Sequence, residues 1–135
     1  MSTEENKAAL HRAVENWNKG DLNAYLQLYD LDCNYPGVGV GLDPIKKFYE
    51  DFWIAFPGNQ LVLGDVIAEG DKVACNFILT GTHQGNMMGI PPTGKQVKIT
   101  GSTIMRFGDG KCVERWSQSD FLGLLQQLGV APAHG

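Results

Sequence analysis

The hydrophobic pattern of this chain changes its period once, near residue 60. Before that point apolar residues recur at helical spacing, as Leu10, Val14 and Trp17 do. After it they alternate with polar residues, as around Val73 and Cys75. The first spacing gathers side chains on one helix face, whereas the second gathers them on one strand face. A chain that forms helices first and strands afterwards is expected to fold as an α+β domain.

Capping and turn signals divide the first half into three predicted helices. Ser2 and Glu5 form a capping box for the first, Asp21 caps the second, and Pro44 suits the first turn of the third. The glycine-rich residues 37–41 are expected to form a flexible loop at the edge of a pocket. The predicted helices cover residues 3–19, 22–29 and 44–56.

The second half predicts an antiparallel meander of strands. Tight turns at Gly70-Asp71 and Gly108-Asp109-Gly110 separate neighbouring strands. The sheet must cover its apolar face with the helices, so we expect one domain over residues 1–130 and a frayed tail over residues 131–135. The strands are predicted at residues 60–69, 72–82, 96–107 and 111–120, followed by a short helix at residues 122–128.

Charge and motif content exclude several classes of function. The net charge of -4 disfavours nucleic acid and anionic membranes as partners, and the polar, acidic N-terminus favours a cytoplasmic protein. Cys33, Cys75 and Cys112 have no zinc-binding spacing and are expected to be reduced. Residues 89–95 resemble a phosphate-binding loop, but two prolines remove amide donors and a strand pattern follows. Neither a metal nor an organic cofactor is expected.

Four residues form the candidate site. Trp116, Gln118 and Asp120 are two apart on the last predicted strand, so they share a face. His83 is in phase with the more apolar face of its own strand, and we expect His83 and Asp120 to enter one cavity. The alternatives are structural: Asp120 caps the following helix, His83 is a hydrogen-bonded residue at a strand end, Trp116 belongs to the core and Gln118 binds backbone.

Three stretches resemble the SnoaL-like polyketide cyclases of the nuclear transport factor 2-like superfamily. Together with the helix order they cover nearly the whole chain. They are Ala68-Glu69-Gly70-Asp71-Lys72-Val73, then Gly81-Thr82-His83-Gln84-Gly85 with Gly89-Ile90-Pro91-Pro92-Thr93-Gly94-Lys95, and finally Glu114-Arg115-Trp116 through Asp120 and Leu124-Leu125-Gln126-Gln127-Leu128-Gly129.

The resemblance implies a cone-shaped, cystatin-like fold with a curved antiparallel sheet around a pocket. It implies ring closure of a polyketide by intramolecular aldol condensation without a cofactor, with Asp120 as acid and base and His83 as a hydrogen-bond donor to the substrate. Asn34 matches a polar pocket position loosely. Gln118, Trp116, Trp53 and Phe56 complete the expected substrate contacts, and a homodimer is expected.

Other functions of the same fold stay open. A non-catalytic domain that binds a small apolar ligand would use Asp120 only as a helix cap. A related isomerase would need a tyrosine and a protonated acid as an oxyanion pair. Epoxide hydrolysis would need an arginine between two carboxylates, and Arg106 and Arg115 are out of phase with Asp120 on the predicted strands. A purely structural dimer subunit is the last alternative.

Overall fold

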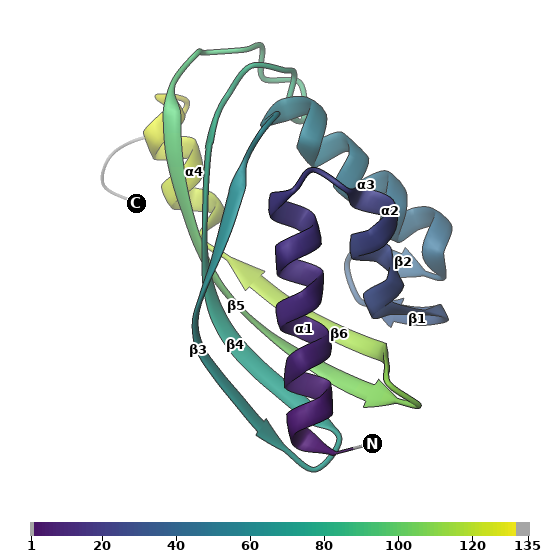
Figure 1. Cartoon of the computed structure of the whole chain (residues 1–135). Helices are drawn as coiled ribbons and strands as arrows, with labels where there is room; N and C mark the ends of the chain where they lie inside the picture. Colours follow the sequence, from purple (N-terminus) through teal and green to yellow (C-terminus); the bar gives the residue numbers. More distant parts are fainter. Residues whose placement is uncertain (1, 132–135) are drawn as a thin grey trace.

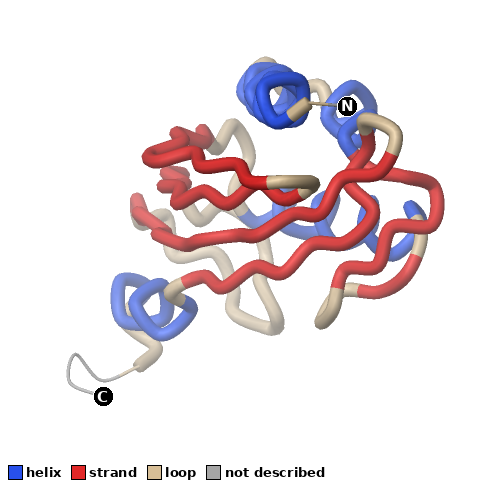
Figure 2. Tube along the Cα trace, turned by 90° about the horizontal axis from the view of Figure 1, so that it is seen from below, coloured by secondary structure: helices blue, strands red, loops and turns tan. Residues whose placement is uncertain are grey.

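The computed structural model describes residues 2–131 and has a curled six-stranded sheet packed against helices (Figure 1). The helix α1 lies along the concave side of the sheet, and α4 lies at the far end beside β5 (Figure 1). Figure 2 shows the bend of the strands from below. In chain order the elements are α1 (Thr3–Asn18), α2 (Leu22–Tyr25), η1 (Leu26–Leu28), β1 (Tyr29–Tyr35), β2 (Gly39–Val40), α3 (Leu42–Ala55), β3 (Gln60–Glu69), β4 (Lys72–Thr82), β5 (Gln96–Gly108), β6 (Lys111–Ser119) and α4 (Phe121–Leu128).

The capping box predicted for the first helix is present at the start of α1, which ends at Asn18, one residue earlier than predicted. The Ser2 hydroxyl accepts a hydrogen bond from the Glu5 amide at 3.0 Å, and the Glu5 carboxylate accepts one from the Ser2 amide at 3.1 Å. This capping box satisfies two amides that the helix itself leaves unpaired. The apolar face of α1 is buried, with Leu10 and Trp17 each 3% exposed.

The second predicted helix is shorter than expected. It ends at Tyr25, and a single 3-10 turn leads into β1, which begins at Tyr29. The prediction of helix through residue 29 was wrong because β1 pairs in parallel with β6, a long-range contact that outweighs the local spacing. The glycine-rich residues also form structure, since Gly39–Val40 is the strand β2 beside β1.

The meander and closing helix are confirmed. The strand order is β2-β1-β6-β5-β4-β3, and β3 through β6 pair antiparallel with their neighbours in sequence. The segment 89–95 lies in the connection between β4 and β5, and a strand follows it rather than a helix.

The hairpin of β5 and β6 contains an extra residue. Beyond the turn, Phe107 pairs with Cys112, but the next pair is Arg106 with Glu114. Val113 therefore has no counterpart on β5 and forms a β-bulge.

The bulge decides which side chains of β6 face inward. Beyond it Met105 pairs with Arg115 and Thr103 pairs with Ser117. Met105 and Thr103 are buried residues of the inner face of β5, 0% and 2% exposed. Because one inserted residue turns every following side chain to the other face, Arg115 and Ser117 face inward and Trp116 faces outward.

No helix between residues 2 and 131 is long and apolar enough to cross a membrane. A cytoplasmic location stays a prediction. The expected frayed tail lies, apart from Ala131, outside the described residues.

Candidate functional site

Apolar side chains enclose a cavity of about 690 Å³ between the inner face of the sheet and the helices. This volume is within the range of pockets that hold small organic molecules. The apolar lining comes from α1, α3, α4, the sheet and the connection between β4 and β5: Leu10, Val14, Trp17, Phe48, Phe52, Ile54, Leu61, Leu63, Cys75, Phe77, Leu79, Met87, Met88, Ile99, Phe121 and Leu124.

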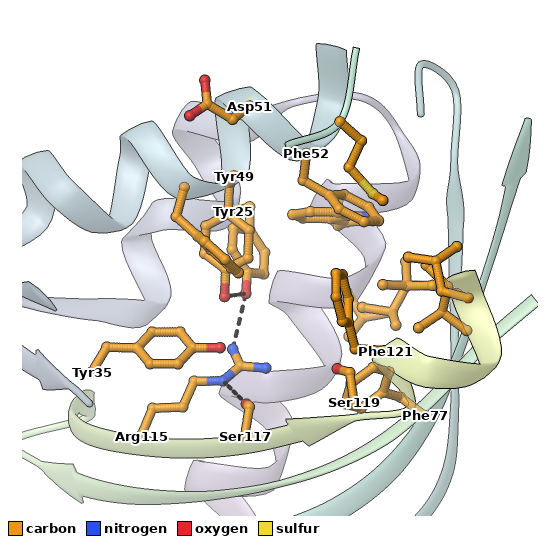
Figure 3. Close-up of a pocket in the computed structure, with 18 of the residues that line it drawn as sticks. Tyr25, Tyr35, Tyr49, Asp51, Phe52, Phe77, Arg115, Ser117, Ser119 and Phe121 are labelled. Atoms are coloured by element: carbon orange, nitrogen blue, oxygen red, sulfur yellow. Dashed lines mark hydrogen bonds between the residues drawn. The ribbon is translucent and has the colours of Figure 1, made fainter. Parts of the chain in front are cut away.

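Most of the polar groups labelled in the cavity gather around Arg115, namely Tyr25, Tyr35, Tyr49 and Ser117 (Figure 3). Its Nη1 donates hydrogen bonds to the hydroxyls of Tyr25, at 3.0 Å, and Tyr29. Its Nε donates to the hydroxyls of Thr103 and Ser117, each at 3.1 Å. Four neutral hydroxyls thus hold the guanidinium in a single orientation.

The tyrosine hydroxyls beside Arg115 form a closed triangle. Tyr25 and Tyr29 are 2.8 Å apart, Tyr29 and Tyr49 are 2.6 Å apart, and Tyr25 donates to Tyr49 at 3.0 Å. If each hydroxyl donates to the next around the triangle, its remaining lone pair is free for another donor. The residues come from α2, β1 and α3, so the triangle joins α3 to the neighbouring elements α2 and β1, which lie at least 20 residues earlier at Tyr25 and Tyr29.

Arg115 has no acidic partner in the part of the chain that the structure describes. Among residues 2–131, no carboxylate forms an ion pair with it. The one carboxylate in the cavity lining is Asp51, which pairs with Lys47 at 2.6 Å and points away from Arg115 (Figure 3). The polar end of the cavity therefore holds an unneutralised positive charge.

The protonation states maintain this charge. Burial raises the pKa of Tyr29 and the pKa of Tyr49 well above the ordinary value, and the nearby Arg115 offsets only part of this rise. Burial acts to lower the pKa of Arg115, but the surrounding tyrosines outweigh it, so this pKa also lies above its ordinary value. Tyr29 and Tyr49 therefore stay neutral and Arg115 stays charged at neutral pH.

Trp116, Gln118 and Asp120 do not have the predicted orientation. Trp116 is 40% exposed on the outer face of the sheet, Gln118 is exposed, and neither lines the cavity. Ser117 and Ser119 line it in their place, because the bulge at Val113 reverses the phase.

Asp120 caps the helix α4. Its Oδ1 accepts a hydrogen bond from the Gly123 amide at 2.8 Å, which is the structural alternative weighed from the sequence. The side chain is exposed and does not line the cavity, but the residues on either side, Ser119 and Phe121, both do. Asp120 thus lies at the rim, and its catalytic role stays a prediction.

His83 is completely buried behind the cavity wall. The strand β4, which ends one residue before it, presents Cys75 and Leu79 to the cavity in the expected phase, but His83 itself packs against Phe56 with ring centroids 5.5 Å apart. Its Nδ1 is 3.0 Å from the Thr93 hydroxyl, and its Nε2 has no hydrogen-bond partner among residues 2–131. His83 and Asp120 are not brought together in one cavity, and the role of His83 stays a prediction.

The other expected substrate contacts also lie outside the lining. Asn34 is exposed on β1. Trp53 packs edge-on against Trp17, with ring centroids 4.8 Å apart. Phe56 is 1% exposed and packs against Phe52 at 5.1 Å. Trp53 and Phe56 therefore support aromatic residues that do line the cavity.

Sequence reasoning missed Arg115, Ser117 and the tyrosines. The turn between β5 and β6 indicates the register of this hairpin near Cys112. If the two strands paired from there without a bulge, Trp116 would lie on the inner face of the sheet. One extra residue at Val113 reverses this result. Nothing in the local pattern marks that position.

Among the described residues, no three His, Cys, Asp or Glu side chains lie together in a way that could hold a metal ion. Cys33, Cys75 and Cys112 are free and buried.

Comparison with known proteins identifies the family. The model of the SnoaL-like polyketide cyclases matches residues 7–128. The chain belongs to the SnoaL-like polyketide cyclase family. Aklanonic acid methyl ester cyclase DnrD of Streptomyces peucetius is 27% identical, over 89% of this chain and 88% of the relative.

Two solved structures are similar to this chain in both sequence and fold. AclR of Streptomyces galilaeus, a proposed hydroxylase, is 35% identical over 97% of this chain and 100% of its own, with a TM-score of 0.88. IdmH of Streptomyces antibioticus, a proposed polyketide cyclase, is 30% identical over 93% and 99% of the two chains, with a TM-score of 0.76. The SnoaL-like fold expected from the sequence is confirmed.

Proposed function

We propose that this protein closes a ring in a polyketide-like or other β-dicarbonyl small molecule by intramolecular aldol condensation. The observation that carries the proposal is the cavity of about 690 Å³, which has apolar walls and one polar, positively charged end. The walls can fold a carbon skeleton on itself and exclude water, while the polar end can bind its oxygens. The relative named as a methyl ester cyclase supports a substrate of this class.

The reaction needs one base and no oxidant. The base removes a proton from the carbon between two carbonyls, which leaves an enolate. The enolate carbon attacks a second carbonyl of the same molecule, forming a carbon–carbon bond. The resulting alkoxide then takes the proton back from the acid that the base has become, so one carboxyl group can serve twice and the step requires no cofactor.

Asp120 is the proposed base. Its position between two residues of the cavity lining supports this assignment. The carboxylate must first leave the Gly123 amide and turn toward the cavity. Loss of such a cap costs about 1 kcal/mol, which is small beside the effect of a general base. The donor roles predicted for His83 and Gln118 would require movement too, because neither lines the cavity.

Hydroxylation is the second candidate, and the 35% identity to AclR favours it. The mass of the product separates the two reactions. An aldol addition leaves the mass of the substrate unchanged and a following dehydration removes one water, whereas hydroxylation adds one oxygen. We would incubate the protein with linear chains bearing a 1,3-dicarbonyl group and a distal ketone, with and without dioxygen and a two-electron donor that reduces its second oxygen atom to water. Binding without any product would favour the non-catalytic alternative.

Blocking the cavity should abolish turnover. Ser119 lines the cavity and makes no side-chain hydrogen bond among the described residues, so Ser119→Phe fills space without breaking a contact. We expect product formation to fall at least about 10-fold, since the filled volume is no longer available to the substrate. Ser102→Phe is the matched control, because Ser102 is exposed on the outer face of the sheet. Equal turnover by both variants would place the reaction outside this cavity.

A homodimer is proposed through the outer face of the sheet. The registers place Trp116, Ile104, Ala74 and Ile67 side by side across β6, β5, β4 and β3. Trp116, Ile104 and Ile67 are 40%, 46% and 66% exposed. An apolar row of this kind favours self-association.

Sedimentation velocity tests the dimer. Ile104→Lys places a charge in the middle of the row and should convert a dimer to a monomer. Leu31→Lys, at a residue 74% exposed on β1, should leave the dimer intact. A wild-type protein that sediments as a monomer at micromolar concentration would refute the proposal.

A further inference from the structure

Two N–H groups of Arg115 are left for a ligand. A guanidinium has five N–H donors: one on Nε and two on each terminal nitrogen. Nε is used by Thr103 and Ser117, and Nη1 by Tyr25 and Tyr29. Nη2 has no acceptor among residues 2–131, and Figure 3 shows it on the side of the guanidinium that faces the cavity.

We propose that Arg115 binds the ionised enol or phenol oxygen of the substrate through Nη2. This inference deepens the proposed function and rests on it for the class of substrate. Arg115 is then the residue that holds the enolate oxygen while the new bond forms.

The charge around Arg115 selects an anion over a neutral group. Arg115 carries one positive charge, and the cavity carboxylate, Asp51, points away from it (Figure 3). Burial raises the pKa of Cys75, which keeps that thiol neutral in the wall. The attraction between an anion and an unpaired positive charge is stronger in an apolar cavity than in water. The titratable side chains around the guanidinium are the phenols of Tyr25, Tyr29, Tyr35 and Tyr49 and the thiols of Cys33, Cys75 and Cys112.

Hydrogen-bond geometry selects one oxygen rather than a carboxylate. A carboxylate usually binds two parallel N–H groups on adjacent guanidinium nitrogens. Each such pair on Arg115 includes either Nε or Nη1, and both are committed to protein hydroxyls. The two N–H groups of Nη2 diverge, so each can meet a single oxygen. An enolate or phenolate oxygen fits this arrangement.

The aromatic stacking on Arg115 supports a fixed role. The guanidinium carbon lies 5.5 Å from the ring centre of Tyr35 and 6.0 Å from that of Tyr29. These contacts stabilise the cation without supplying a counter-ion. They also hold Nη2 in place before a ligand arrives, so less ordering is needed on binding.

The first test compares an ionised enol with its neutral ether. The probes are 2-hydroxy-1,4-naphthoquinone, which is an anion at neutral pH, and 2-methoxy-1,4-naphthoquinone. Binding is followed by isothermal titration calorimetry. We expect the wild-type protein to bind the anion about 10- to 100-fold more tightly than the ether, the usual contribution of a charged hydrogen bond. Arg115→Met should abolish this preference. Phe77→Leu, in the apolar wall, should change both affinities by the same factor.

The second measurement needs no variant and therefore stands even if Arg115→Met is unstable. The visible absorption of the hydroxyquinone reports its ionisation. A nearby cation favours the charged form and lowers the pKa of the bound enol, whereas an apolar cavity alone would raise it. We expect the bound probe to stay ionised to a lower pH than the free probe. A bound probe that protonates at a higher pH than the free one would overturn the assignment.

A third comparison, between a carboxylate and its methyl ester, tests whether Arg115 binds carboxylates instead. The result against the proposal is that the protein prefers 2-naphthoate over its methyl ester by a larger factor than it prefers the ionised enol over the ether. In that case Arg115 is a carboxylate site and the proposal is wrong.

Turnover separates this inference from the proposed function. If Arg115→Met closes the ring at the wild-type rate, the proposed role of Arg115 is wrong but the proposed cyclase activity stands. If the wild-type protein binds the enolate tightly but forms no product, the binding site stands and the cyclase activity is rejected.

Discussion

Asp120→Asn is expected to lower the rate of ring closure about 100- to 10,000-fold, the usual range for loss of a general base. The substitution is informative because asparagine caps helices as well as aspartate does. The bond to the Gly123 amide can therefore persist, and the Tm should stay close to the wild-type value. The measurement is kcat on a substrate identified by product mass, together with the Tm.

Asp51→Asn is the control for this prediction. Asp51 is the carboxylate that lines the cavity in the structure as it stands, and it is engaged with Lys47 on the surface of α3. If Asp51→Asn removes activity while Asp120→Asn retains it, Asp51 is the base and Asp120 is only a cap. Asp120→Ala adds a further distinction, because it should also lower the stability by about 1 kcal/mol through the lost cap.

Phe56→Ala is expected to lower the free energy of unfolding by about 3–5 kcal/mol, as is usual for a large aromatic truncated in a core. Phe56 is 1% exposed and packs between Phe52 and His83. The truncation leaves a cavity behind the wall of the binding site. The measurement is urea unfolding followed by circular dichroism.

Phe56→Leu separates packing from substrate contact. It keeps most of the buried volume, so its loss of stability should be clearly smaller than that of Phe56→Ala. Affinity for the neutral ether 2-methoxy-1,4-naphthoquinone should change little in Phe56→Leu, because Phe56 does not line the cavity. A large loss of affinity with normal stability would restore the substrate contact predicted from the sequence.

The amino-acid sequence by itself determined the elements whose signals are local. The cap at Ser2, the strands from residue 60 onward and the helix after Asp120 could all be predicted, because caps, turns and hydrophobic period act over a few neighbouring residues. The inward phase of Cys75 followed from the same reasoning.

The tertiary structure alone decided where the chemistry lies. Tyr29 begins a strand rather than ending a helix because its partner is β6, more than 80 residues away at Cys112. The bulge at Val113 turned Arg115 inward and Trp116 outward, and a single extra residue in a ladder has little local signature. Arg115 is half-buried without a carboxylate partner among the described residues, and the hydroxyls that bind it converge only after the helices and strands have packed together.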